Sequence, residues 1–387
     1  MSATSDRSVL FTGEQFFLRR RRPLIDAVEA SGLKIGLLPV QERTPRETLD
    51  VAISMAEFGA RALLAADDRP LRDRLDPRNL RQAFPKSVES FEVKSRQMAN
   101  KLATRSAQFD VILHVFCLSS PFVGPPTIPY AHYLDYTYAL SMRNNPEEPR
   151  PFSKEDRDRW LELERSSYAR ASKLFPMSAL VRDSLINDYG VDPEKIVVVG
   201  AGGNVLRPVQ KPKSFGSRQL LFNASDFYRK GGDAVMAAFA NLQARDPSLR
   251  LVTVGRPLPR EYAGQPGVTD RGALHGTDLL ELFDGSDLVL GPARCDPFPG
   301  FVIEAMNAGT PSVVAAFDGM PEIVTDGVDG VVLPRVETAL VEAAIFDLVN
   351  DTEKLRRFSE AGRRKIRERL NWSSVAEKMM PFLRGDA

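Results

Sequence analysis

DPFPGFVIEAMNAGTPSVVAAFDGMPEIV, residues 296–324, is the most informative stretch of this 387-residue chain. Before it, the apolar run DLVLGPA (287–293) predicts a buried strand. CDPFPG then predicts a loop, and FVIEAMNA (301–308) predicts a helix that ends at Gly309. The first-turn N–H groups of such a helix are unpaired, and its macrodipole adds about half a positive charge there. The junction therefore favours an anion, and a diphosphate fits it.

Two carboxylates lie eight positions apart across this junction, Asp296 in the loop and Glu304 in the first turn of the expected helix. They cannot both serve a phosphate, so they are candidates for accepting hydrogen bonds from sugar and ribose hydroxyls. The ordinary alternative is that Asp296 forms a turn and Glu304 is a plain N-terminal helix acid. For an isolated pair of acids that alternative is the commoner one, and both interpretations stay open at this point.

The whole block resembles the glycosyltransferase family 4 pattern, E-x-F-G-x-x-x-x-E-A-M-x-x-G-x-P-V-(V/I)-A followed by G-G-x-x-E-I-V. Asp296 stands where the family usually carries Glu, which keeps the charge but shortens its reach by a methylene. The family's phenylalanine-glycine pair is split here by Pro299. The matching positions are Phe298, Glu304, Ala305, Met306, Gly309, Thr310, Pro311, Val314, Ala315, Gly319, Pro321, Glu322, Ile323 and Val324.

This resemblance implies an α/β chain with the GT-B fold, in which two Rossmann-like, doubly wound parallel-sheet domains face a cleft. It implies a retaining, metal-independent, hexosyl-type glycosyltransferase without a cofactor, whose substrate is a UDP- or GDP-linked sugar. The acceptor is an unidentified glycan, lipid-linked or small-molecule hydroxyl. Asp296 would hold sugar hydroxyls and Glu304 the ribose. The diphosphate would meet the loop amides of the segment Phe298, Pro299, Gly300 and Phe301.

A second informative loop lies in FNASDFYRKGGDAVMAAF (222–239), between an expected strand and an expected helix. Arg229 and Lys230 sit beside Gly231, which adds no side chain to keep a diphosphate away. A solvated basic turn is the alternative. The resemblance assigns both cations to the donor diphosphate and includes Lys230 among the catalytic residues, while Ser225 replaces the arginine of the commoner family form. Arg256, just past the strand VTVG, is a further donor-side candidate or an exposed strand-end arginine.

Two places in the N-terminal half are expected to complete the site. His132 and Asp135 belong to or follow the expected strand IPYAHY, and by resemblance they are catalytic candidates beside the transferred sugar. A lone histidine is as often a packing residue. Gly13 ends the first strand, and with Glu14 it forms a loop in which the family usually carries a glycine pair near the donor phosphates or the acceptor.

The segment from Phe16 to Arg22 sets two phenylalanines and a leucine beside four consecutive arginines. Such a surface can lie on an anionic membrane. The preferred alternative is that Phe16 and Phe17 pack in the core while the arginines are solvated or bind an anionic acceptor.

Composition bounds the remaining function classes. A net charge of +1, 43% hydrophobic and 27% charged residues describe a globular protein with no general attraction to nucleic acid. Two distant cysteines and three histidines argue against a disulfide framework or a structural zinc and indicate a reducing compartment. The chain carries no apolar run of about 20 residues and no secretory hydrophobic region. We expect a cytoplasmic protein, membrane-peripheral if the arginine segment binds lipid.

Short apolar runs alternate with amphipathic stretches along the chain, which predicts parallel sheets. Expected strands start at residues 8, 34, 60, 110, 173 and 196 in the first half, and at 219, 249, 287, 311 and 330 in the second. The expected boundaries are an acceptor-side domain (1–206), a linker (207–219), a nucleotide-sugar-binding domain (220–370) and a C-terminal helix (371–387) that crosses back to the first domain.

One alternative function belongs to a different class. The missing glycine pair, Ser225 and Asp296 would also suit a catalytically impaired sugar-nucleotide-binding protein of the same fold. A nucleotide-dependent dehydrogenase is the weaker rival, because no G-x-G-x-x-G follows a strand.

Overall fold

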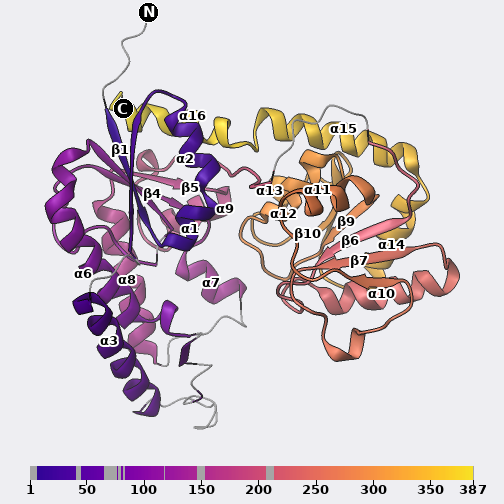
Figure 1. Cartoon of the computed structure of the whole chain (residues 1–387), viewed down its shortest axis with the longest axis horizontal. Coiled ribbons are helices and arrows are strands. Elements are labelled where there is room, and N and C mark those ends of the chain that lie inside the picture. Colours follow the sequence, from indigo (N-terminus) through magenta and orange to yellow (C-terminus); the bar gives the residue numbers. More distant parts are fainter. Residues whose placement is uncertain are drawn as a thin grey trace, which may run out of the picture. The chain divides into compact units, whose positions relative to one another are not determined.

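The computed structural model describes residues 7–40, 45–64, 76, 80–81, 83–116, 118–145, 153–205 and 213–386. It divides into two compact units. The first unit comprises Met1–Val199 with Ala376–Ala387, and the second comprises Gly200–Val375. Each is an α/β unit built on a parallel sheet, as the sequence predicts (Figure 1).

The first unit has a five-stranded sheet in the order β2-β1-β3-β4-β5. Every pairing in it is parallel. Its strands are β1 (Ser8–Gly13), β2 (Lys34–Pro39), β3 (Val111–Val115), β4 (Tyr130–Leu134) and β5 (Lys173–Pro176). Its helices are α1 (Gln15–Arg20), α2 (Arg22–Glu29), α3 (Pro45–Leu64), α6 (Val88–Arg105), α7 (Tyr138–Asn144), α8 (Lys154–Arg170) and α9 (Ala179–Asn187), and α16 (Trp372–Arg384) lies mostly within the same unit.

The second unit has a six-stranded parallel sheet in the order β11-β10-β9-β6-β7-β8. Its strands are β6 (Gln219–Asn223), β7 (Arg250–Val254), β8 (Val268–Asp270), β9 (Leu288–Gly291), β10 (Ser312–Ala315) and β11 (Gly330–Leu333). Its helices are α10 (Gly232–Arg245), α11 (Gly276–Gly285), α12 (Gly300–Ala308), α13 (Met320–Ile323), α14 (Thr338–Val349) and α15 (Thr352–Glu368).

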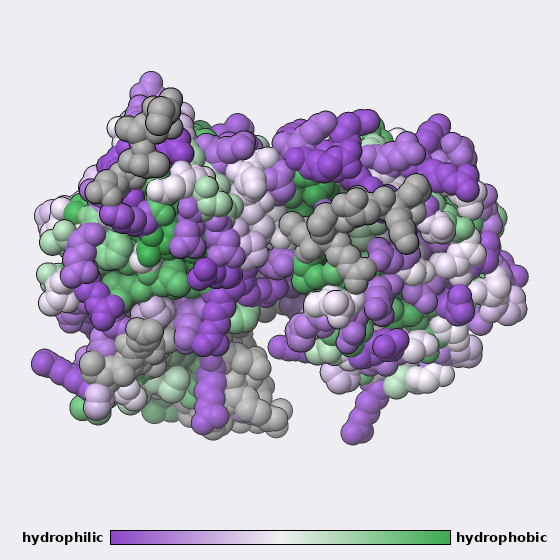
Figure 2. Space-filling model, turned by 45° about the horizontal axis from the view of Figure 1, so that its top comes forward, coloured by the Kyte–Doolittle hydropathy of each residue, from purple (hydrophilic) through white to green (hydrophobic). Residues whose placement is uncertain are grey.

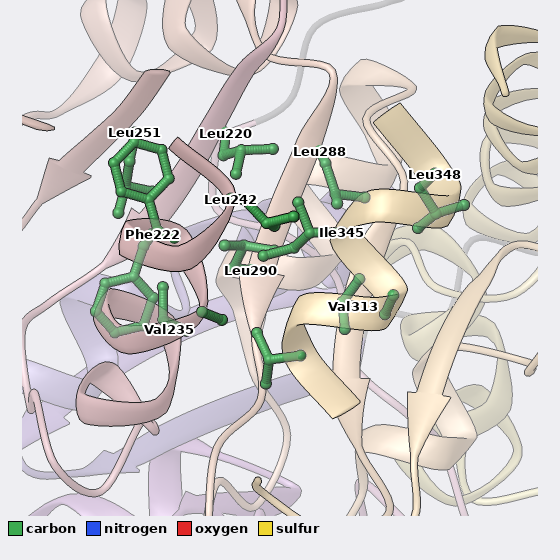
Figure 3. Close-up of a cluster of buried hydrophobic side chains, with 14 of the residues drawn as sticks. Leu220, Phe222, Val235, Leu242, Leu251, Leu288, Leu290, Val313, Ile345 and Leu348 are labelled. Atoms are coloured by element: carbon green, nitrogen blue, oxygen red, sulfur yellow. The ribbon is translucent and has the colours of Figure 1, made fainter. Parts of the chain in front are cut away.

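Both faces of the second sheet are buried, which explains its continuously apolar strands. Successive strand side chains point to opposite faces, so Leu220 and Phe222 of β6 pack under α10 and α14 (Figure 3). Leu221, between them, packs on the other face with residues of α11 and α12. Because parallel strands all end at one edge, this covering leaves the loops at their carboxyl ends to form a site.

Two expected strands differ from the structure. Residues 60–64 form the end of helix α3, because ARALL consists of strong helix formers that continue a helical segment; residues 65 and 66 lie outside the described residues. Residues 196–200 form no strand, although Val197 and Val199 donate backbone hydrogen bonds to Leu174 and Pro176 of β5. The sequence did not indicate β8, a three-residue edge strand whose side chains are partly or fully exposed.

Part of the expected linker, residues 207–212, lies outside the described residues. The remainder belongs to the second unit. Asp287 accepts backbone N–H bonds from Gly216, Ser217 and Arg218, and Lys213 donates to the carbonyls of Phe283 and Asp284. Residues 213–219 are thus bonded to α11 and to the start of β9.

Hydrophilic residues, purple in Figure 2, cover the second unit over α15. Leu355, Phe358 and Ile366 face inward from this helix while its arginines are mostly exposed. None of the helices in the described part of the chain is long and apolar enough to cross a membrane.

Neighbouring residues of α14 provide a test of the second core. Ile345 is fully buried in the cluster of Figure 3, whereas Phe346 is 54% exposed. We expect Ile345→Ala to lower the free energy of unfolding by about 2–5 kcal/mol through lost burial and a cavity. Phe346→Ala is the matched control and should cost about 0.5 kcal/mol or less. Urea unfolding measures both, and equal losses would contradict this packing.

Candidate donor site in the second unit

The carboxyl ends of β6 and β9 and the start of α12 surround a small cavity that opens to solvent. Open parallel sheets bind ligands at this edge. The cavity contains both charged and apolar groups. Its lining residues are Phe222, Asn223, Lys230, Leu290, Gly291, Ala293, Asp296, Pro299, Phe301, Val302 and Met320.

Three of the predicted charged residues converge here. The Asp296 Oδ2 atom lies 3.9 Å from Arg229 Nη1 and 3.9 Å from Lys230 Nζ. All three side chains are mostly buried, with about a fifth or less of their surface exposed. The two cations therefore form one cluster with the carboxylate near the N-terminus of α12, although more than sixty positions separate them in the sequence.

Backbone contacts bring the two loops of this cluster together. Gly231 has a left-handed φ of 76°, and a Cβ there would collide with the Pro292 carbonyl. The Arg294 N–H donates to the Arg229 carbonyl at 2.8 Å. Arg229 also donates to Asp226 Oδ2 at 2.5 Å and to the carbonyl of Cys295. The close approach of the loops thus requires glycine at position 231.

The loop segment expected to meet a diphosphate leads into α12. Pro299 is the residue before the helix, and its carbonyl accepts from Val302 N–H at 3.1 Å. Pro299 and Phe301 line the cavity. Phe298 packs against Gly319, where a Cβ would lie 2.7 Å from the phenylalanine ring. Gly300 is the first helical residue.

Glu304 lies one residue further into the helix than the sequence suggested. Since α12 begins at Gly300, Glu304 belongs to its second turn and is 7% exposed. Its Oε1 atom accepts the backbone N–H groups of Asn204 at 2.9 Å and Val205 at 3.3 Å. The interpretation of Glu304 as a plain first-turn acid is therefore wrong, because the carboxylate is buried and fixed by a distant loop.

Trp372 holds that distant loop in place. Its indole N–H donates to the Gly203 carbonyl at 2.7 Å, and its ring occupies the space that a Cβ on Gly202 would need. The next two residues present their N–H groups to Glu304. By contrast, Arg256 is exposed after Gly255 and is not among the residues that line the cavity.

Two predicted residues of the first unit lie at the end of β1. Gly13 has φ of 138°, and a Cβ there would lie 2.6 Å from the Val115 carbonyl. Glu14 forms an ion pair with Lys94 of α6 at 2.7 Å, with only 17% and 7% of the two side chains exposed. Lys94 could not be recognised as this partner from the sequence, because it lies eighty positions away on a different helix.

His132 lies inside the first sheet, fully buried on β4 and directly opposite His114 of β3. Its Nε2 atom lies 2.8 Å from Ser167 Oγ. Ser120 Oγ donates to the Phe122 carbonyl, so Ser167 must donate to Ser120 and His132 must donate to Ser167. His132 therefore carries its proton on Nε2.

Burial also determines the charge of this histidine pair. Burial, assisted by the neighbouring His114 and Arg170, holds the pKa of His132 well below its ordinary value. Burial likewise lowers the pKa of His114 to about 4. Both rings are neutral at pH 7. Asp135, the other first-unit candidate, directly follows β4 and is only partly buried.

In the segment from Phe16 to Arg22, Phe17 and Leu18 pack inward, but the expectation that Phe16 packs in the core is wrong. Phe16 is 58% exposed, with the Arg20 guanidinium 5.4 Å from its ring centre. Phe17 stacks on Phe116 at 4.4 Å, and Leu18 is buried. Membrane contact through this segment stays a prediction.

Asp318 is a site residue that sequence reasoning missed. It occupies the first position of the family's glycine pair, has a positive φ of 51°, and accepts the Asp296 N–H at 2.9 Å through Oδ2. The substitution within that glycine pair was the available signal. Within the residues that the structure describes, no three His, Cys, Asp or Glu side chains are grouped so that they could hold a metal ion.

The buried histidines predict a pH dependence of stability. Between pH 6.5 and about 4 these two histidines take up protons in the unfolded chain but not in the folded protein, so their contribution to stability falls as the pH falls. Glu164, whose pKa burial raises to about 7, contributes in the opposite direction. Between pH 7 and 5 we expect each buried histidine to contribute about 2 kcal/mol to this loss. His132→Gln, whose amide can still donate to Ser167, should reduce the loss.

Urea unfolding at pH 5 and pH 7 measures this effect. His275→Gln is the matched control, because His275 is exposed and makes no side-chain cap bond at α11. An unchanged pH dependence in His132→Gln would contradict the neutral, buried assignment.

Residues 208–365 match the family model described as Glycosyl transferases group 1. The glycogen synthase of Mycobacterium tuberculosis is 26% identical over 217 residues, which cover 53% of this chain and 52% of that protein. The chain thus spans about half the length of that relative. The MMP alpha-(1->4)-mannosyltransferase of Mycolicibacterium hassiacum is 26% identical over 300 residues, 73% of this chain and 72% of that protein.

Solved structures share the fold. Sucrose-phosphate synthase from Thermosynechococcus elongatus superposes with a TM-score of 0.71 at 17% identity, over 98% of this chain and 99% of that chain. Anabaena HepE in complex with UDP and glucose superposes with a TM-score of 0.62 at 16% identity, over 98% and 100%. The GT-B fold prediction is confirmed, while the family 4 subtype stays a prediction. Residues 208–365 are thus similar to the glycosyl transferases group 1.

Proposed function

We propose that this protein is a retaining, metal-independent glycosyltransferase that moves a hexose from a UDP- or GDP-linked sugar to an acceptor hydroxyl. The observation that carries the proposal is the convergence of Arg229, Lys230 and Asp296 beside the start of α12. This group offers positive charge for a diphosphate beside a carboxylate for sugar hydroxyls, and Lys230 and Asp296 line the same cavity.

The diphosphate would take the place between the cations and the helix start. Arg229 and Lys230 supply two fixed positive charges, and Gly231 lets the backbone approach closely. The N–H groups of Gly300 and Phe301 are first-turn donors of α12, which have no partner within the helix. The same groups would stabilise the leaving diphosphate as its charge develops, which is the task that a metal ion performs in other enzymes.

The two carboxylates would divide the donor's hydroxyls between them. Asp296 faces the cavity and would accept from the sugar. Glu304 would accept from the ribose, since an ionised carboxylate has about four lone-pair sites and its Oε1 atom already takes two backbone N–H groups. Those backbone bonds fix the carboxylate before the donor arrives, which lowers the entropic cost of binding.

In the transfer step the acceptor oxygen forms a bond to the anomeric carbon while the bond from that carbon to the diphosphate oxygen breaks. The nucleoside diphosphate leaves, and its phosphate oxygen takes the acceptor proton on the same face, so the anomeric configuration is retained. Of the two first-unit candidates for steadying positive charge on the sugar, His132 is enclosed in the sheet, and the role of Asp135 stays a prediction.

Substitution of Glu304 tests the ribose assignment. Glu304→Gln keeps an acceptor for the Asn204 and Val205 N–H groups, so the fold should be preserved. We expect it to weaken UDP or GDP binding at least roughly tenfold, because a charge-assisted hydrogen bond is lost. Isothermal titration calorimetry measures this, with Glu360→Ala on the exposed side of α15 as control. Unchanged nucleotide affinity in Glu304→Gln would contradict the assignment.

Metal removal and substitution of Lys230 test the catalytic electrostatics. Transfer or donor hydrolysis, measured as released nucleotide, should survive EDTA. It should fall by roughly 10²-fold in Lys230→Ala, because a fixed charge at the leaving group is removed. Lys354→Ala on α15 is the charge-matched control.

Two outcomes would contradict the proposal. Activity that EDTA abolishes and Mg²⁺ or Mn²⁺ restores would show that a metal is required. Nucleotide binding without hydrolysis or transfer on any sugar and acceptor in a broad panel would support the impaired binding protein instead.

A further inference from the structure

Asp318 lies in the loop that follows β10, two residues before α13. It is one of three described residues other than glycine with a positive φ, together with Phe116 and Arg218. Its φ of 51° is in the left-handed region, which L-residues adopt at a steric cost and which glycine adopts freely. A residue kept in such a conformation at the edge of a candidate site calls for a physical reason.

The Asp318 side chain supplies that reason. Its Oδ2 atom accepts the backbone N–H of Asp296 at 2.9 Å. A carboxylate bonded to a backbone N–H is a charge-assisted acceptor, stronger than a neutral one. Glycine at position 318 would relieve the backbone but would leave this N–H without that acceptor.

A second bond joins the same two loops. The N–H of Gly319 donates to the Pro297 carbonyl at 3.1 Å, and a Cβ at position 319 would collide with that carbonyl and with the Phe298 ring. The loop after β10 and the loop before α12 are therefore joined by reciprocal hydrogen bonds, one from each loop. Asp296, whose carboxylate lies 3.9 Å from two cations, is at the centre of this arrangement.

We propose that Asp318 is a positioning residue for Asp296, and that it fixes the backbone from which the Asp296 carboxylate reaches the transferred sugar. The inference rests on the proposed function, because it assigns Asp296 to the sugar. The constraint matters more for an aspartate than for a longer side chain, since fewer rotatable bonds are available to recover a displaced carboxylate.

Three substitutions separate this role from a purely structural one. Asp318→Gly relieves the positive φ and removes the acceptor, so we expect its Tm to stay within about 3 °C of the wild type. Asp318→Asn keeps an oxygen acceptor and a side chain that tolerates the left-handed region. Asp318→Ala removes the acceptor and keeps the strain, so it should be the least stable of the three.

The second measurement is the affinity for the sugar part of the donor. A purely structural role of Asp318 would not change this affinity selectively. Two ligand pairs are first compared by calorimetry on the wild-type chain: UDP with UDP-glucose, and GDP with GDP-mannose. The pair that binds is used for the variants. We expect Asp318→Gly to weaken the nucleotide sugar roughly tenfold while bare-nucleotide affinity changes less than about twofold. Asp318→Asn should restore most of the loss.

A double-mutant cycle tests whether the effect passes through Asp296. In an Asp296→Ala background, Asp318→Gly should cause no further loss of nucleotide-sugar affinity. Hydrogen exchange of the Asp296 amide, followed by mass spectrometry on peptides covering residues 294–300, should be faster in Asp318→Gly than in Asp318→Asn.

The outcomes distinguish this inference from the proposed function. If the wild-type chain binds no nucleotide or nucleotide sugar, the proposed function fails and the positioning role fails with it. If the wild type binds a donor but Asp318→Gly keeps its affinity, or if the loss persists undiminished in the Asp296→Ala background, only the role of Asp318 is overturned. Unchanged exchange of the Asp296 amide would also overturn it.

Discussion

The close approach of two backbone loops at Gly231 is the constraint on which the candidate donor site depends. The left-handed glycine packs against the Pro292 carbonyl, and the Arg294 N–H bonds to the Arg229 carbonyl. A side chain at position 231 would push these loops apart and separate the cations from Asp296. The electrostatics of the site thus follow from backbone packing that only glycine permits.

The acidic residues of the site are held by backbone groups rather than left to find their positions on binding. Two N–H groups of the loop before β6 hold the Glu304 carboxylate, and Trp372 in turn holds that loop. Asp318 bonds the N–H of Asp296. Groups fixed in this way need little reorganisation when charge develops on a leaving group, which is the usual source of electrostatic catalysis.

Much of the second unit could be predicted from the sequence, because local sequence patterns indicate its strands and its helix ends. Apolar runs such as LLF in β6 predict strands that are buried on both faces, and Gly309 marks the end of α12. The edge strand β8 could not be predicted, because its three partly or fully exposed residues show no apolar pattern. Residues 60–64 were misassigned because a short apolar run of alanine and leucine fits a buried strand and a helix equally well.

The candidate site also has a part that could be predicted from the sequence and a part that could not. The charged residues Arg229, Lys230 and Asp296 could be grouped in advance, because loops at the carboxyl ends of parallel strands meet at one edge. The contacts that support these residues could not be predicted, since the hydrogen bond from the Asp296 N–H to Asp318 depends on how two loops pack in three dimensions. The enclosure of His132 was equally hidden, because it depends on the helices that cover its strand.

A crystal structure of the full chain with UDP or GDP tests the central claim most directly. We expect diphosphate oxygens within hydrogen-bond distance of Lys230 Nζ and of the first N–H groups of α12, with a ribose hydroxyl on Glu304. A nucleotide whose diphosphate lies away from α12, or whose ribose makes no contact with Glu304, would contradict it.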